Sequence, residues 1–391
     1  MDTPRTVTIV GAGLAGHAAA RALRRQDFTG SITVVGDENE APYDRPPLSK
    51  QFLAGTATEA DLALAGADED LDLSWRLGSR AVGLDVATRT VQLADGSVLG
   101  ADAVLVATGS RARTLPDSLA GVHTLRTLSD ARALRAELRP GRQLVVIGAG
   151  FIGAEIAATA HGLGLQVTVV EAAPTPLAGP LGVQLGAAVA ALHQRHGVAL
   201  ECGVPVVGLV GADRVTGVRL ADDRVLAADL VVVGIGAEPV VDWLADSGMD
   251  VAGGLLCSAV GRAAPGVFGV GDCAAWFDPV RGHPVRVEHW TDSRDRAAIA
   301  VTALLGGPAQ PPARAPYFWS DQYGVRIQFA GRRYGDEDVS IEAGDPDRDD
   351  LLAVYRREGR PTAVLALNQP QQFMRLRKTL VTTPAGPAGA L

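Results

Sequence analysis

Two glycine-rich turns of one design, Gly-x-Gly-x-x-Gly, occupy residues 11–16 and 148–153 and carry the clearest chemical signal in this sequence. Each follows an apolar run typical of a buried strand and opens a helical pattern. There the glycines allow a tight turn and a close backbone approach to a pyrophosphate, whose charge the helix N-terminus attracts. Such a turn can also serve packing alone, but this context favours a dinucleotide site in each unit.

Acidic residues near the end of the second strand of each unit strengthen this interpretation, because a carboxylate there accepts hydrogen bonds from ribose hydroxyls. They are Asp37 and Glu38 in the first unit and Glu171 in the second. Glu171 would also repel a 2′-phosphate, and no arginine follows it up to Leu177, so NADH is favoured over NADPH. Two dinucleotides on one chain suggest electron transfer between them, with FAD in the first unit and NADH in the second.

The elements that must hold these turns follow an α/β pattern that stops and restarts. Strand patterns within residues 6–35 and at 101–107 form one half of a doubly wound unit. The pattern resumes at Gln143 with a strand, the second turn, a helix over 151–163 and another strand. The chain therefore contains an internal repeat of domain size.

The rest of the chain contains two short apolar strands and then a different residue pattern. Apolar runs at 228–236 and 266–272 each stop at glycine. After about Arg314 aromatic and polar residues alternate as in antiparallel strands, which predicts a third, α+β domain. The terminal PAGPAGAL, residues 384–391, is expected to be disordered.

Composition excludes several classes of protein. A formal net charge of −8 without a long basic stripe argues against nucleic acid as a partner. Cys202, Cys257 and Cys273 stand far apart without a CxxC, so neither a metal site nor a redox dithiol is expected. No apolar run approaches the ~18 residues of a membrane span and no basic leader precedes the first strand, so we expect no membrane association and a cytoplasmic location.

Lysine is rare in this chain, which draws attention to the two that are present. Lys50 and Lys378 are the only lysines among 36 basic residues. A lysine retained against such a bias is expected where a compact charge is needed, since the planar guanidinium of arginine cannot replace it.

Further motifs resemble those of known reductases. ATGS at 107–110, GIGAEP at 234–239 and GVFGVGDCA at 266–274 resemble, in this order, motifs of the two-dinucleotide flavoprotein reductases. APYDRPPLSKQFLAG at 41–55 and WSDQ at 319–322 resemble the putidaredoxin-reductase-like group of ferredoxin and rubredoxin reductases, which serve Rieske oxygenases and cytochromes P450. The resemblance therefore runs nearly from end to end.

This resemblance implies an α/β fold class, with two Rossmann-like dinucleotide-binding domains of the glutathione-reductase-like kind and a C-terminal α+β domain. Residues 1–113 and 241–314 would form the two segments of the FAD-binding domain. Residues 114–240 would form the NADH-binding domain, and residues 315–391 the C-terminal domain with its tail.

The implied activity is that of an FAD-dependent, NADH-dependent ferredoxin reductase. It would take a hydride from NADH onto FAD and pass single electrons to a [2Fe–2S] ferredoxin that feeds a P450 or Rieske oxygenase, as a monomer or homodimer. An NADH oxidase and a redox-sensing, protein-binding flavoprotein resembling apoptosis-inducing factor are the alternatives.

The resemblance also assigns roles near the flavin. Lys50 would lie near its reactive edge as a buried cation paired with Glu155, where it would favour negative charge on the ring. Trp290 would lie against the ring and exclude water. A surface lysine, a solvated helix glutamate and a core tryptophan are the plainer interpretations.

The other matching positions divide between the two dinucleotides. Asp272 would bond the flavin's ribityl chain, His289 receives no catalytic role, and Phe151 would either gate the nicotinamide site or merely pack. The further FAD-binding positions are Gly11, Gly13, Ala15, Gly16, Asp37, Arg45, Pro46, Ala107, Thr108, Gly109, Gly271, Asp272, Glu288 and His289. The NADH-binding positions are Gly148, Gly150, Phe151, Ile152, Gly153, Glu155, Glu171 and Gly236.

An acidic ferredoxin would need a basic surface on this acidic chain. The candidates from the sequence are Arg332, Arg333, Arg375, Arg377 and Lys378, although a charge run is more often a solvated face.

Overall fold

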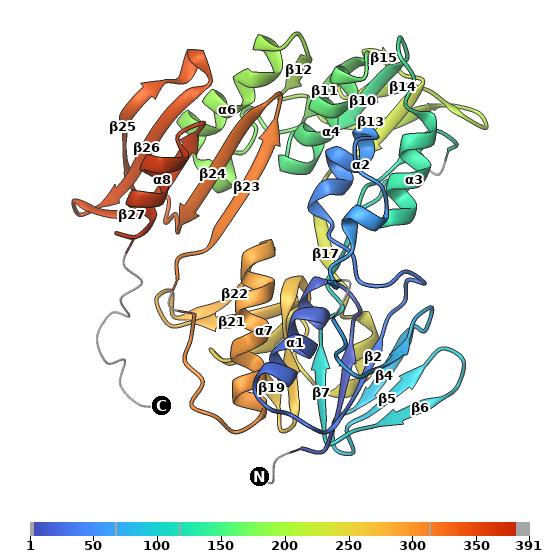
Figure 1. Cartoon of the computed structure of the whole chain (residues 1–391). Coiled ribbons are helices and arrows are strands. Elements are labelled where there is room, and N and C mark those ends of the chain that lie inside the picture. The colour runs from blue at the N-terminus through green and yellow to red at the C-terminus, as the bar shows by residue number, and fades with distance from the viewer. Residues whose placement is uncertain (1–3, 67–68, 117–118, 313, 381–391) are drawn as a thin grey trace.

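The computed structural model describes residues 4–66, 69–116, 119–312 and 314–380, which form three units (Figure 1). The predicted disordered tail, 384–391, lies outside the described residues. Two units are built on mainly parallel sheets and the third on an antiparallel sheet. The predicted fold class, two Rossmann-like units with a C-terminal α+β unit, is confirmed.

The first unit is built on a six-stranded sheet with the order β19-β20-β7-β1-β2-β3, parallel except for β19. Its central strands are β-branched or apolar and almost fully buried, as parallel strands covered on both faces must be. In this spatial order the strands are Arg262–Ala264, Val267–Gly269, Ala103–Val106, Thr6–Val10, Ser31–Val35 and Leu73–Arg76.

Helices α1 (Leu14–Arg25) and α7 (Trp290–Leu304) lie side by side on this unit (Figure 1). Its short helices are η3 (Asp242–Ser247) and η4 (Gly271–Cys273), whereas the segment with η1 (Pro46–Ser49), α2 (Gln51–Ala54) and η2 (Ala60–Leu62) extends from the first unit and packs into the apolar core of the second. Its two smaller sheets consist of β4 (Ala81–Asp85), β5 (Thr90–Leu93) and β6 (Val98–Gly100), and of β18 (Leu255–Cys257), β21 (Ala274–Asp278) and β22 (His283–Arg286).

The second unit repeats the parallel arrangement with a five-stranded sheet. In the order of the sheet its strands are β12 (Ala199–Cys202), β11 (Gln166–Glu171), β10 (Gln143–Ile147), β16 (Leu230–Val233) and β9 (Val122–His123). A small sheet contains β13 (Val206–Gly211), β14 (Val215–Leu220) and β15 (Val225–Ala227). The helices are α3 (Leu128–Glu137), α4 (Phe151–Gly162), α5 (Ala178–Leu181) and α6 (Val183–Arg195).

The chain passes between these units twice, and the two passages pair with each other. β8 (Ser110–Ala112) on the way out is antiparallel to β17 (Ala237–Pro239) on the way back. The boundaries predicted at 113/114 and 240/241 fall beside these strands.

The third unit is a five-stranded antiparallel sheet. Its strands, in the order of the sheet, are β23 (Tyr317–Gln322), β24 (Val325–Gly331), β27 (Arg360–Leu367), β26 (Asp350–Arg357) and β25 (Asp338–Asp345), with the short helix η5 (Pro346–Arg348). One face packs on α5 and α6 through an apolar cluster, and α8 (Pro370–Arg377) covers the other face with Phe373. The sheet thereby lies beside the second unit (Figure 1).

The two parallel units are equivalent residue by residue at their glycine turns. Gly11 donates its N–H to Val35, and Gly148 donates to Val170, both at 2.7 Å. In the strand register Val10 pairs with Val35 and Ile147 with Val170, so Gly36 in the first unit takes the place of Glu171 in the second. The internal repeat thus extends to the hydrogen-bond register. Among the residues that the structure describes, no helix is long and apolar enough to cross a bilayer.

A buried histidine contributes to the contact between the second and third units. His193 of α6 is 2% exposed, and its Nδ1 lies 2.6 Å from the hydroxyl of Tyr323, in the turn between β23 and β24. His196 stacks on the same Tyr323 ring at 4.8 Å. Burial lowers the pKa of His193 to about 4, so its ring is neutral and its Nδ1 is able to accept a hydrogen bond from the tyrosine hydroxyl.

His193→Asn tests this contact, because the amide oxygen can still accept from Tyr323 but does not titrate. The unfolded chain protonates this histidine near 6.5 and the folded protein near 4, so stability is lost as the pH falls through this window. The full loss is about 3 kcal/mol. We expect the free energy of unfolding in urea to fall more steeply with decreasing pH for the wild type than for the variant, and equal slopes would contradict the assignment.

Candidate functional site

In the first glycine turn, residues 11–16, two of the three glycines have no room for a Cβ atom and the middle one has room. A Cβ on Gly11 would lie 2.1 Å from the carbonyl oxygen of Ala107, and a Cβ on Gly16 would lie 1.9 Å from that of Gly11. The middle glycine, Gly13, has only the Arg45 guanidinium at 4.0 Å. The outer glycines therefore serve packing, and the middle one leaves room for a ligand against the backbone.

The second turn, residues 148–153, has the same geometry. A Cβ on Gly148 would lie 2.3 Å from the oxygen of Gly234, and one on Gly153 would lie 2.2 Å from that of Gly148, whereas nothing lies within 4 Å of Gly150. Neither α1 nor α4 has a side-chain cap or an acidic residue in its first turn. Both helix N-termini thus keep free N–H groups beside an open glycine, which is the arrangement that a pyrophosphate requires.

Glu171 faces the second turn directly. Its Oε2 accepts the N–H of Ala149 within the turn at 3.0 Å, and its Oε1 accepts that of Ala173 at 2.9 Å. The carboxylate therefore stands beside the turn, where a ribose would lie next to a bound pyrophosphate.

The first unit places its acidic residues differently from the second. A Cβ on Gly36, the position equivalent to Glu171, would lie 2.6 Å from the Cβ of Ala12, so no acidic residue fits there. The acids follow one and two positions later. Asp37 pairs with the exposed Arg80 at 2.9 Å, and Glu38 pairs with Arg45 at 2.6 Å.

Predicted residues from distant parts of the chain gather around the first turn. Gly11 packs against Ala107 and Thr108, and a Cβ on Gly271 would lie 2.8 Å from that of Ala15. Pro46 opens η1 directly after Arg45. The residues that meet here are Ala15, Ala107, Thr108, Gly109 and Gly271.

Asp272 is held by an arginine that the sequence analysis missed. Its Oδ2 accepts from the guanidinium of Arg126 at 2.7 Å, and Arg126 also donates to the carbonyl of Ser110 at 2.9 Å. Arg45 in turn donates to the carbonyl of Arg126. Two arginines and one carboxylate thus line the first site, a donor set suited to a phosphate and to hydroxyls. No spacing rule connects Arg126 to Asp272, which lies 146 positions away.

The pair expected from the resemblance is present and buried. Lys50 Nζ lies 2.8 Å from Glu155 Oε2, and their side chains are 12% and 7% exposed. Ser49 donates to the same oxygen, Ser320 donates to Oε1 at 2.8 Å, and the N–H of Asp321 lies 3.4 Å from Oε1. One carboxylate of α4 therefore receives donors from the first and third units. Ser49 and Ser320 carried no chemical signal of their own in the sequence.

The segment 288–290 leads into α7 at this junction. Trp290 is the first residue of the helix, and its Nε1 donates to Asp44 at 2.6 Å. His289 is the N-cap residue, and its ring lies 5.1 Å from that of Phe318. Glu288 pairs with Arg286 and is 40% exposed.

Aromatic side chains connect the second turn to α7. Phe151 lies 4.6 Å from Phe318 between ring centroids, and Phe318 lies against His289. Ile152 is 46% exposed at the start of α4. Gly236, at a φ of +99°, follows the strand end that packs on Gly148.

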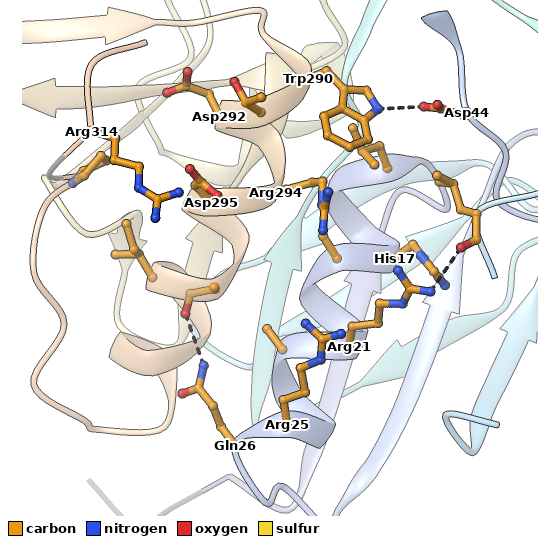
Figure 2. A pocket seen from close by; sticks show the side chains of 18 of the residues that line it. His17, Arg21, Arg25, Gln26, Asp44, Trp290, Asp292, Arg294, Asp295 and Arg314 are labelled. Carbon is orange, nitrogen blue, oxygen red and sulfur yellow. Dashed lines mark hydrogen bonds between the residues drawn. The ribbon is translucent and has the colours of Figure 1, made fainter. Parts of the chain in front are cut away.

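A cavity of about 760 Å³ opens between α1 and α7, with Trp290 and Asp44 in its wall. Figure 2 shows Arg21, Arg25 and Arg294 beside one another along these helices, with Arg314 across from them. The arginines that line it are Arg21, Arg25, Arg294, Arg314 and Arg377. We call this cavity the arginine groove.

Two of the basic residues proposed from the sequence as a docking surface are used internally instead. Arg332 is 14% exposed and pairs with Asp278 at 3.1 Å, and Arg333 donates to the carbonyl of Gly179 at 2.9 Å. Their role as a free basic patch was a wrong expectation. Arg375 and Lys378 are exposed on and after α8, and Arg377 lines the arginine groove.

Comparison with known proteins gives matches along the whole chain. The model of the pyridine nucleotide-disulphide oxidoreductase family matches residues 5–297, and that of the reductase C-terminal domain matches residues 317–388. The chain is 38% identical to the ferredoxin--NAD(+) reductase component of a biphenyl dioxygenase system from Paraburkholderia xenovorans, over 94% of this chain and 91% of that one.

Two further relatives agree. Rhodocoxin reductase of Rhodococcus erythropolis is 37% identical over 96% of this chain and 90% of its own length. The covalent putidaredoxin reductase–putidaredoxin complex has a reductase fold that superposes with a TM-score of 0.92 at 32% identity, covering 96% of this chain and 93% of that chain.

Gly150→Ala tests the second turn. Gly150 has a φ of −72° and nothing within 4 Å, so alanine should leave the fold and the thermal unfolding unchanged. Its methyl group would stand where the pyrophosphate approaches, and we expect the Kd for a pyridine nucleotide, measured by calorimetry, to rise about tenfold or more. Gly162→Ala, at the other end of the same helix with equal space, is the control and should bind normally. Equal affinity for both variants would remove the turn from the site.

Proposed function

The chain belongs to the pyridine nucleotide-disulphide oxidoreductase family, and we propose that it is an NADH-dependent ferredoxin reductase of the putidaredoxin-reductase-like group. One hydride from NADH carries two electrons, which would reduce two molecules of a [2Fe–2S] ferredoxin and release one proton. The observation that carries the proposal is the Lys50–Glu155 pair, because it joins the segment beside the first turn to the helix that opens at the second.

Bound FAD supplies the chemistry, accepting a hydride and releasing electrons one at a time. The residues of the chain bind and orient it. Backbone N–H groups at Gly13 and the start of α1 would hold the pyrophosphate, and Asp37 or Glu38 the adenosine ribose. Asp272 and Arg126 would hold the polyol chain and its phosphate. Lys50, paired with Glu155, would favour negative charge on the bound ring, since the site is poorly screened.

NADH would dock at the second turn with its adenosine ribose on Glu171. The two accepted N–H bonds fix this carboxylate beside the turn, where it repels a 2′-phosphate. Phe151, at the start of α4 against Phe318, would cover the nicotinamide end and exclude water. Glu155 follows on the same helix, one turn further on.

The partner we propose is an acidic ferredoxin that serves a Rieske oxygenase or a cytochrome P450. The relatives support it: one is the reductase component of a biphenyl dioxygenase system, and another is joined to putidaredoxin. The arginine groove offers five arginines to such a partner, next to the carboxylates of Asp44, Asp61, Asp292 and Asp295, and its wall at Trp290 and Asp44 lies near Lys50. A cytoplasmic location belongs to this proposal, because NADH is supplied there.

The cysteines disfavour a dithiol reductase. All three are free, and Cys257 and Cys273 are buried. Burial raises the pKa of both thiols, so neither is a ready nucleophile. This leaves the NADH oxidase and the redox sensor as the alternatives that an experiment must separate from the reductase.

Anaerobic stopped-flow reduction of the purified protein tests the function. NADH should bleach the flavin rapidly, NADPH should do so at least about tenfold less efficiently, and a [2Fe–2S] ferredoxin mixed next should take up the electrons. Glu171→Ala should reduce the ratio between the efficiencies of flavin reduction by NADH and by NADPH. Bleaching without onward transfer would point to the oxidase if oxygen reoxidises the protein quickly, and to the sensor if the reduced form persists in air.

Charge reversal in the arginine groove tests the docking surface. Arg25 and Arg314 are exposed, so Arg25→Glu with Arg314→Glu should leave the fold and the NADH-to-ferricyanide turnover unchanged. The KM for ferredoxin should rise about tenfold at low salt, because long-range attraction is lost. Arg360→Glu, at the exposed first residue of β27, is the matched control. An unchanged KM in the double variant would move the docking surface elsewhere.

A further inference from the structure

We propose that Asp44 is a positioning residue that holds the indole of Trp290 as a shield between the flavin site and the arginine groove. This inference rests on the proposed function and deepens it. Its geometric basis is one hydrogen bond, from Trp290 Nε1 to Asp44 Oδ1 at 2.6 Å, between residues 246 positions apart.

The backbone that carries Asp44 is itself fixed. The N–H of Asp44 donates to the carbonyl of Leu62 at 2.7 Å, and the preceding Tyr43 forms a β-bridge with Ala63. Directly after Asp44 the chain enters η1 and reaches Lys50. The acceptor for the indole therefore stands on a backbone tied at both sides, beside the lysine of the flavin site.

Apolar packing does not hold Trp290 in place. It belongs to none of the five apolar clusters that the described residues form, unlike Trp276, and it lines the groove. Its neighbours are polar or aromatic: the guanidinium of Arg294 lies 4.8 Å from its ring centroid, and the ring of Trp319 meets it edge-on at 5.8 Å. Figure 2 shows the indole N–H directed at Asp44, with Arg294 below the ring. The hydrogen bond therefore sets the orientation that packing leaves free.

The charges around Asp44 fit this role. Burial raises the pKa of its carboxyl, and the indole N–H, Lys50 and Arg294 oppose the rise. A carboxylate here accepts a short, charge-assisted hydrogen bond, which is stronger than a neutral one. Asparagine would keep an oxygen acceptor in the same place, whereas leucine would remove it and keep a similar volume.

The orientation of the Trp290 indole at the start of α7 affects a bound flavin in two ways. An indole held in a fixed orientation beside a bound flavin quenches its fluorescence and shields it from dioxygen. An indole released from Asp44 would sample other rotamers, since the contacts of its ring with Arg294 and Trp319 do not engage its N–H. Oxygen and water would then reach a bound flavin more easily.

The test compares Asp44→Leu, Asp44→Asn and Trp290→Phe with the wild type, each as the FAD-loaded protein labelled with 5-fluorotryptophan. Trp290→Phe assigns the resonance of Trp290 among the five tryptophans. Asp44→Leu should shift that resonance, raise the flavin fluorescence severalfold and raise the rate of reoxidation by oxygen about tenfold. Asp44→Asn should remain near the wild type in all three measurements.

A double-mutant cycle separates positioning from general damage. If Asp44 acts through Trp290, Asp44→Leu in the Trp290→Phe background should change neither the flavin fluorescence nor the reoxidation rate further. Additive effects, or an unshifted Trp290 resonance in Asp44→Leu, would overturn the proposal. Failure of the wild type to pass electrons to ferredoxin would instead overturn the function, so the two failures are distinguishable.

Discussion

The buried carboxylate of Glu155 is the interaction on which the arrangement of this site depends. An ionised group in a poorly solvated place is costly unless donors surround it. Glu155 obtains them from Lys50 and Ser49 of the first unit and from Ser320 and Asp321 of the third, while its own helix begins at the second glycine turn. This carboxylate therefore links all three units, in addition to the apolar cluster that holds the third unit on α5 and α6.

The internal repeat shows how one design serves two ligands. Both turns close their outer glycines by packing and leave the middle one open. The two turns differ in the residue at the end of the neighbouring strand. In the second unit this residue is Glu171, which lies beside its turn, and in the first it is Gly36, where Ala12 leaves no room for a side chain. The second site thus presents a carboxylate directly to a ribose. In the first, Arg45 and Arg126 add further contacts, which suits a cofactor that stays bound rather than one that exchanges.

The arginines of this chain differ in whether acidic groups and carbonyls of the fold engage them. Arg332 and Arg333 are adjacent in the sequence and resemble a basic patch, but Asp278 and the carbonyls of α5 engage them. The groove between α1 and α7 instead collects arginines from four separate segments of the chain. Within the groove Arg21 pairs with Glu69, whereas Arg25 and Arg314 are exposed and are the arginines most accessible to a partner.

The sequence by itself determined the fold class, the two dinucleotide turns and the acidic residue of the second site, because these are local patterns of strand, glycine and helix within some 30 residues. The Lys50–Glu155 pair followed from the resemblance of two motifs. Arg126 on Asp272, the serines on Glu155 and Asp44 on Trp290 were decided only by the tertiary structure. A single polar side chain has no periodicity and no spacing of its own, so its partner is set by which segments the fold brings together.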